Sequence, residues 1–248
     1  MVPLRPNEKS PFGESAARIV HAPGHADNQL VLYDDTRSIL FAADHLLLGI
    51  TPNIGLWPES EPHPLARYLE SLEGMLGLGA GPRAPGPGPV FHDLDGRIGE
   101  LIPHHEERLE RMRREIEGSS KIPYEVSRVV FRGTLTLHQR CFALAETLAH
   151  LDHLVLEGRV ERIENETVVF RAAKIRRRDY VRTQGRRYRR PVGSHRGRAR
   201  RLLLRRASPP SIMYAHPYDS NMGFIVSCIG RVIWLSLSYR SSKVRRPR

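Results

Sequence analysis

Cysteine is scarce in this sequence, and so are long apolar runs. The 248 residues include two cysteines, Cys141 and Cys228, which are too few for a disulfide framework and predict a reducing, cytoplasmic compartment. Residues 1–15 lack the apolar core of a signal peptide. The longest apolar stretch, 222–238, is slightly short for a bilayer span and carries Arg231 at its middle. We therefore expect neither a secreted disulfide-rich domain nor a membrane protein.

Acidic residues are almost absent from the last third of the chain. Residues 171–248 contain 22 of the 39 Lys and Arg residues but only two of the 27 acidic residues, Asp179 and Asp219. Their net charge is therefore +20, whereas residues 1–170 carry a net charge of −8. Apolar residues in this basic segment show no helical or strand period, so we predict a disordered basic tail over 172–248.

Two interpretations of the basic tail remain open. An arginine-rich arm would bind RNA or DNA non-specifically through phosphate contacts and counterion release. Alternatively, Arg, Pro, Gly and Ser in these proportions are what translation of GC-rich DNA in a wrong frame produces, and the segment would then have no selected function. The first interpretation predicts binding that weakens steeply with salt and is lost when the chain is cut after residue 171.

The N-terminal body shows the periodicities of strands followed by a helix. Residues 17–20 and 29–33 are expected to be strands around a tight turn. The apolar run 38–47 is expected to contain a third strand, which ends at Asp44. This third run is apolar enough to predict burial on both faces. Pro64 begins a helix with apolar residues at a spacing of three and four.

The second half of the body predicts three helices and a hairpin. A charged helix begins near Arg97, and a boundary falls near 118–123. A short helix over 124–131, a longer helix over 137–158 and a hairpin over 159–171 then give the outline of a winged-helix module. The expected buried side of the longer helix consists of Phe142, Leu144, Ala145, Leu148, Leu151 and Val155.

Four short stretches follow one another in a characteristic order. They read HAPGHADNQLVLY, LFAADHLL, GITPNIGLWPE and HHEERL. This ordered set resembles the metallo-β-lactamase-fold hydrolases, in particular the branch with a C-terminal winged helix that includes the β-lactamase-like protein 2 group and lies near glyoxalase II. The resemblance covers about residues 17–171.

The resemblance implies an α+β fold and a division of the chain into three parts. Residues 1–117 would be the C-terminal half of an αββα sandwich, with the N-terminal half missing. Residues 118–171 would be the winged-helix domain, and 172–248 the disordered basic tail. A half sandwich exposes a sheet face and edge, which invites a partner.

The resemblance also implies a metal site, which is incomplete in this sequence. In the family, an HxHxDH motif, a histidine in PGH, a strand-end aspartate and a histidine in PGHGP hold two zinc ions. Carried over, His25 is the PGH ligand and Asp44 is the aspartate that bridges the two zincs. Pro87 stands where the last histidine belongs and has no donor atom, and HxHxDH does not occur.

Other histidines do not restore the set of ligands. His21 lies across a turn from His25, and His45 should point to the opposite face of the strand from Asp44. His104 and His105 are expected on the solvated side of the charged helix. His92 is the remaining substitute, because it lies near the altered loop.

The implied chemistry is zinc-hydroxide hydrolysis of an ester, thioester or phosphodiester in a small-molecule or nucleic-acid substrate. Because two of about seven family ligands remain, we predict that the chain is inactive alone. A non-catalytic nucleic-acid-binding protein acting through the basic tail is the alternative. A third hypothesis is a half-domain that pairs with a separately encoded N-terminal half carrying HxHxDH.

Overall fold

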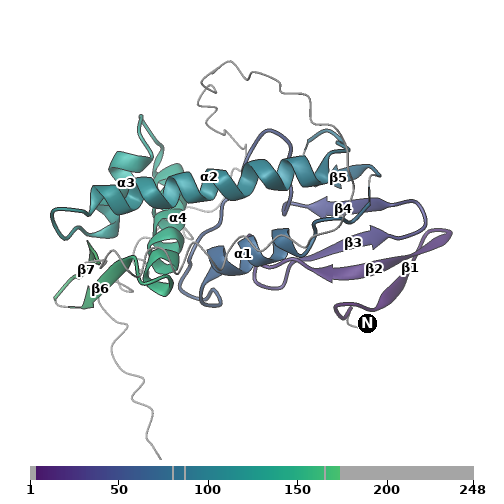
Figure 1. Cartoon of the computed structure of the whole chain (residues 1–248), viewed down its shortest axis with the longest axis horizontal. Helices are drawn as coiled ribbons and strands as arrows, with labels where there is room; N and C mark the ends of the chain where they lie inside the picture. The colour runs from purple at the N-terminus through teal and green to yellow at the C-terminus, as the bar shows by residue number, and fades with distance from the viewer. Residues whose placement is uncertain (1–3, 80, 87, 165, 174–248) are drawn as a thin grey trace, which may run out of the picture.

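A computed structural model of the chain describes residues 4–79, 81–86, 88–164 and 166–173. The basic tail lies outside the described residues from residue 174 onward, as does Pro87. A sheet and one short helix precede a long helix, α2, which Figure 1 shows running from the sheet to the helices at the other end of the molecule. In chain order the elements are β1 (Lys9–Phe12), β2 (Ser15–His21), β3 (Leu30–Asp34), β4 (Ile39–Ala43), α1 (Pro64–Glu73), β5 (Arg83–Pro85), α2 (Leu94–Glu115), α3 (Pro123–Val130), α4 (Leu137–Leu156), β6 (Val160–Glu164) and β7 (Val168–Ala172).

The five-stranded sheet has its strands in sequence order. β1 to β4 are antiparallel neighbours, and β5 pairs in parallel with β4. The predicted strands at 17–20 and 29–33 are confirmed as β2 and β3. Side chains alternate between the two faces of the sheet, and one face joins the core with Tyr68 and Leu72 of α1. Val31, Tyr33, Leu40 and Ala42 form this inner face.

The prediction for the third strand is partly wrong. β4 ends at Ala43, one residue before the expected end at Asp44, but it is buried on alternate residues rather than on both faces. Leu40 and Ala42 are fully buried, whereas Phe41 is half-buried. Ala43 has a φ of 46°, a left-handed conformation that costs a non-glycine residue about 1–2 kcal/mol and ends the strand.

The helices begin where local signals place them. α1 begins at Pro64, as predicted. α2 begins three residues before Arg97, because the Asp93 side chain caps it by accepting a hydrogen bond from the backbone N–H of Gly96. α4 begins after Thr136, which forms a capping box with Gln139. In the described ranges every helix is too short or too polar to cross a membrane.

The buried side of α4 differs from the apolar stripe expected from the sequence. Ala145 and Leu151 are buried as expected, but Phe142 is 37% exposed. Glu146 and His150 lie in the interior instead. Polar groups can be buried when they are paired, and both of these residues have hydrogen-bond partners.

The region after residue 117 contains the predicted helix, helix and hairpin. β6 pairs with β7, and Lys121 exchanges two backbone hydrogen bonds with Phe170, which attaches the hairpin to the start of α3. The winged-helix assignment stays a prediction. One apolar cluster runs from Ala22 to Phe170 without a break at residue 117, and the division into 1–117 and 118–171 likewise stays a prediction.

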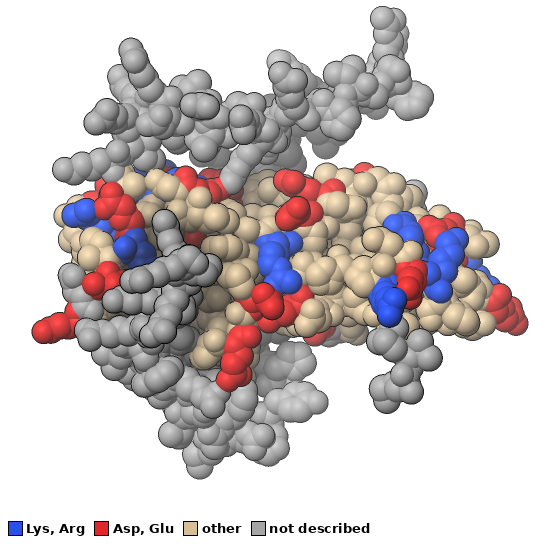
Figure 2. Space-filling view, turned by 90° about the horizontal axis from the view of Figure 1, so that it is seen from below, with Lys and Arg blue, Asp and Glu red and all other residues tan. Residues whose placement is uncertain are grey.

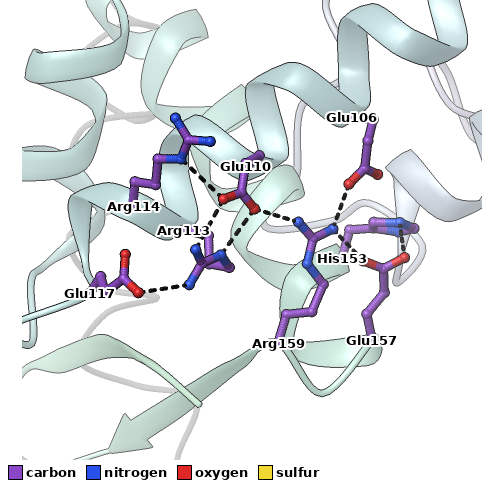
Figure 3. A network of polar contacts seen from close by, with 8 residues as sticks. All are labelled: Glu106, Glu110, Arg113, Arg114, Glu117, His153, Glu157 and Arg159. Atoms are coloured by element: carbon purple, nitrogen blue, oxygen red, sulfur yellow. Dashed lines mark hydrogen bonds and ion pairs between the residues drawn. The ribbon is translucent and has the colours of Figure 1, made fainter. Parts of the chain in front are cut away.

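A network of charged side chains joins α2 to the turn between α4 and β6 (Figure 3). Arg159 contacts Glu106 at 3.0 Å, Glu110 at 3.1 Å and Glu157 at 2.9 Å, and its side chain is 18% exposed. Hydrogen bonds lower the pKa of Glu110 to about 2, and the hydrogen bond from Arg113 contributes most to this shift. The carboxylate therefore stays ionised at neutral pH, and Arg159 links α2 to the turn between α4 and β6.

Substituting Arg159 with Gln should destabilise the chain by about 2 kcal/mol, between the values for exposed and buried ion pairs. Three carboxylates lose their shared cation, and thermal unfolding should occur roughly 4–8 °C lower. Arg114→Ala is the control, because Arg114 is 71% exposed and contacts only Glu110 in this network. Its effect should stay below about 0.5 kcal/mol. Urea unfolding measures the stability of both variants. If both lose the same free energy of unfolding, Arg159 does not join α2 to the turn between α4 and β6.

Candidate metal centre

The turn between β2 and β3 presents His25 and is packed against α1. Gly24 has a φ of 129°, and a Cβ added to it would lie 2.4 Å from the Cβ of Tyr68. The Ser71 hydroxyl donates to the carbonyl of Pro23 at 3.3 Å. Only glycine tolerates both this backbone conformation and this close approach, so the residue preceding His25 sets where the histidine lies.

The two residues predicted as metal ligands lie beside each other. His25 Nε2 is 3.7 Å from Asp44 Oδ2, although 19 residues separate them in the sequence. His25 Nδ1 donates to the backbone carbonyl of Asn53 at 3.0 Å. A carbonyl can only accept, so Nδ1 carries a proton, and in the neutral form of the ring the lone pair is on Nε2, the nitrogen that faces Asp44. The side chains are 33% and 49% exposed, which leaves both accessible to solvent.

The loop that leaves β5 passes next to Asp44. The backbone N–H of Gly86 donates to the carbonyl of Ala43 at 2.8 Å. A Cβ added to Gly86 would lie 2.8 Å from Asp44 Oδ1. Position 86 is thus at the candidate site, as the resemblance of this loop to PGHGP implies. Pro87 itself is outside the described residues.

Within the described residues, no further ligands converge on this pair. No group of three or more His, Cys, Asp or Glu side chains there could hold a metal ion. His21 bonds the carbonyl of Asp27 at 3.3 Å, and His92 is exposed on the surface. His45 lies in the core against the Ser71 hydroxyl, and burial lowers its pKa to about 3.

The expectation that His105 is solvated is wrong. His105 is fully buried, and its Nδ1 lies 3.2 Å from Nε2 of His150 on α4. The flanking sequence contained a usable signal, because His105 continues an apolar stripe with a spacing of three or four. The stripe consists of Ile98, Leu101, His105, Leu109 and Met112. His104, in contrast, remains half-buried at the edge of this interface.

Asn53 and Glu146 were not identified from the sequence. The Asn53 side-chain amide donates to Glu146 Oε2 at 2.8 Å across 93 positions of sequence. Arg108 of α2 forms an ion pair with the same carboxylate. Neither a motif nor a local period marks this triad, because its three members come from a loop and two separate helices.

Basic side chains do not form a continuous stripe on the face drawn in Figure 2. There the described Lys and Arg side chains lie beside Asp and Glu side chains. Ion pairs within the described residues include Arg67 with Asp27 and Arg18 with Asp35. On α4, the polar residues Glu146 and His153 are buried rather than exposed. The described residues therefore offer little support for groove recognition by α4.

Comparison with known families agrees with the fold. Residues 109–175 match the family model described as the metallo-beta-lactamase-like, C-terminal domain. The chain also shares its fold with solved structures of a metallo-beta-lactamase family protein and a beta-lactamase domain protein. These matches relate the chain to the metallo-β-lactamase superfamily.

Individual relatives give the extent of the similarity. A metallo-beta-lactamase family protein from Thermus thermophilus is 34% identical with a TM-score of 0.63, over 69% of this chain and 54% of that one. A beta-lactamase domain protein from Burkholderia ambifaria is 30% identical with a TM-score of 0.66, over 68% and 52%. The lactamase-like protein nscB of Neosartorya fischeri is 29% identical over 144 residues, which cover 54% of this chain and 39% of nscB. The match therefore spans about half of these solved relatives and about two-fifths of this curated one.

Proposed function

We propose that His25 and Asp44 are two ligands of a zinc centre for the hydrolysis of an ester, thioester or phosphodiester, and that the chain alone does not complete this centre. The observation that carries the proposal is the 3.7 Å separation of His25 Nε2 and Asp44 Oδ2. Similarity to the superfamily supports it, because the predicted ligand positions are the ones that the fold brings together.

The donor atoms fit a zinc ion. A neutral imidazole nitrogen and a carboxylate oxygen both suit Zn²⁺, which binds them at about 2.0–2.2 Å, so one ion can span 3.7 Å between the two atoms. The bond from His25 Nδ1 to the Asn53 carbonyl is of the kind that orients metal-binding histidines. When bound, zinc would supply an activated water and polarise the bond to be cleaved.

The residues of the chain itself have defined parts in this proposal. His25 offers the lone pair of Nε2, and Asp44 offers an exposed carboxylate within reach of solvent. Because the 248 residues contain no HxHxDH and Pro87 has no donor atom, the remaining ligands would have to come from outside these residues. A separately encoded segment that carries HxHxDH is the proposed partner.

The purified 248-residue chain is expected to bind zinc weakly and to hydrolyse neither thioesters nor phosphodiesters. Two ligands leave most of the coordination shell to water. Elemental analysis after dialysis should find well under one zinc per chain, and Asp44→Asn should weaken the residual Co²⁺ binding about tenfold. Asp35→Asn is the matched control, because this carboxylate pairs with Lys9 and Arg18 instead.

Two outcomes would contradict the proposal. Two zincs per chain, with turnover that is lost on chelation, would show that these residues do complete a catalytic centre. Co²⁺ binding that responds equally to Asp44→Asn and Asp35→Asn would show that His25 and Asp44 do not act together on a metal.

A further inference from the structure

Asn53 connects His25 to the C-terminal helices through both its backbone and its side chain. Its carbonyl accepts from His25 Nδ1 at 3.0 Å. Its amide nitrogen donates to Glu146 Oε2 at 2.8 Å and to the carbonyl of Phe142 at 3.4 Å. The same residue that contacts the candidate ligand is thus anchored twice to α4.

The Glu146 carboxylate is a fixed anchor. Its side chain is 8% exposed, and Arg108 pairs with Oε1 while Asn53 occupies Oε2. Burial raises the pKa of Glu146, while Arg108 and Asn53 act in the opposite direction by stabilising the ionised carboxylate. A buried carboxylate is costly to leave unpaired, so Glu146 strongly favours the position of Asn53 in which both oxygens are satisfied.

The backbone on the far side of Asn53 is held to the same helix. The N–H of Leu56 donates to the carbonyl of Ala145 at 3.0 Å. A Cβ added to Gly55 would lie 3.1 Å from the Cβ of Ala145, so the loop runs in contact with α4. Side-chain and main-chain bonds together fix residues 53–56 along one turn of α4.

We propose that Asn53, held by Glu146, is a positioning residue that directs His25 into the tautomer with its proton on Nδ1 and its lone pair on Nε2. A neutral imidazole without such a partner prefers the proton on Nε2, which would turn an N–H toward Asp44 and block a metal. The carbonyl of Asn53 reverses this preference. The functional role of this tautomer rests on the proposed metal centre, but the tautomer itself is a property of the metal-free chain.

The experiment is ¹⁵N NMR of the full metal-free chain labelled at histidine, with the His25 signals assigned by their loss in His25→Gln. In the wild type, Nδ1 should show the shift of a protonated nitrogen and Nε2 that of a nitrogen with a lone pair. Asn53→Asp removes both donor bonds at nearly constant shape and places a carboxylate opposite Glu146. It should produce a mixture of tautomers and weaken Co²⁺ binding about tenfold.

A matched control separates positioning from general loosening of the loop. The hydroxyl of Ser60 accepts from the N–H of Trp57 at 3.1 Å within the same loop. Ser60→Ala should leave the His25 shifts and the Co²⁺ affinity unchanged. Asn53→Ala provides a second test in case Asn53→Asp does not fold, as judged by circular dichroism.

The outcomes distinguish this inference from the proposed function. A wild-type His25 protonated on Nε2, or tautomers indifferent to both Asn53 variants, would overturn the inference whatever the metal does. A second combination of results would support the positioning role of Asn53 and overturn the metal centre instead. In it, His25 shows the expected tautomer, Asn53→Asp abolishes it, and His25→Gln leaves Co²⁺ binding unchanged.

Discussion

Lowering the pH from 7 to 5 is expected to reduce the free energy of unfolding by about 2 kcal/mol through His150 alone. Burial lowers the pKa of His150 to about 3, from an ordinary value near 6.5. Below pH 6.5 His150 is therefore protonated in the unfolded chain, whereas in the folded chain it stays neutral down to about pH 3. Between these two pKa values the free energy of unfolding falls by about 1.4 kcal/mol for each pH unit. Stability is complete above about pH 6.5 and is lost as the pH falls.

Besides burial, the hydrogen bond between the two histidines explains why His150 does not readily accept a proton. His150 Nδ1 donates to the carbonyl of Glu146 at 2.8 Å, so its Nε2 must accept from His105 Nδ1. Protonating that Nε2 would set two N–H groups against each other in the core. The pKa of His105 is also held well below the ordinary value, first by burial and then by His150. The stability lost through His105 at low pH therefore adds to the stability lost through His150.

Urea unfolding at several pH values measures this effect. A domain is expected to have a total stability of about 5–15 kcal/mol. The stability lost through His150 and His105 together should therefore bring the chain close to unfolding near pH 5. His150→Gln should flatten the pH dependence, whereas a Gln substitution of the exposed His138 should not. A free energy of unfolding that stays constant between pH 7 and 5 would show that these histidines are not excluded from protonation.

Replacing Gly24 with Ala should destabilise the chain by about 3 kcal/mol. A φ of 129° strains any other residue, and the added Cβ would lie 2.4 Å from the Cβ of Tyr68 in α1. Backbone strain and overpacking each cost about 1–3 kcal/mol. Thermal unfolding is expected roughly 10 °C lower, and the displaced turn should carry His25 away from Asp44.

Gly13 provides the control for this substitution. It also has a positive φ, 59°, but no atom lies within 4 Å of an added Cβ. Gly13→Ala should therefore cost only the backbone strain, about 1 kcal/mol, and leave Co²⁺ binding unchanged. If thermal scans show the same loss in both variants, Gly24 is not required by its contact with α1.

Much of the local structure was predictable because it depends on neighbouring residues. Alternation identified β2 and β3, Pro64 marked the start of α1, and the helices and hairpin after residue 120 followed from periodicity and turn residues. His25 and Asp44 were identified by the resemblance of their motifs, and the structure brings them together. The burial of β4 on one face only was not predictable from its apolar pattern, because it depends on what packs against each face of the sheet.

By itself, then, the sequence determined the order of the elements, the identity of the two candidate ligands and the separation of an acidic body from a basic tail. The tertiary structure alone decided which partners the buried polar side chains meet in the core. His105 and Glu146 are buried because α2 and α4 bring His150 and Arg108 to them. Asn53 reaches His25 and α4 at once only after the chain has folded. Local periodicity cannot contain this information, because the stability of a buried polar group depends on a partner that lies far away in the sequence.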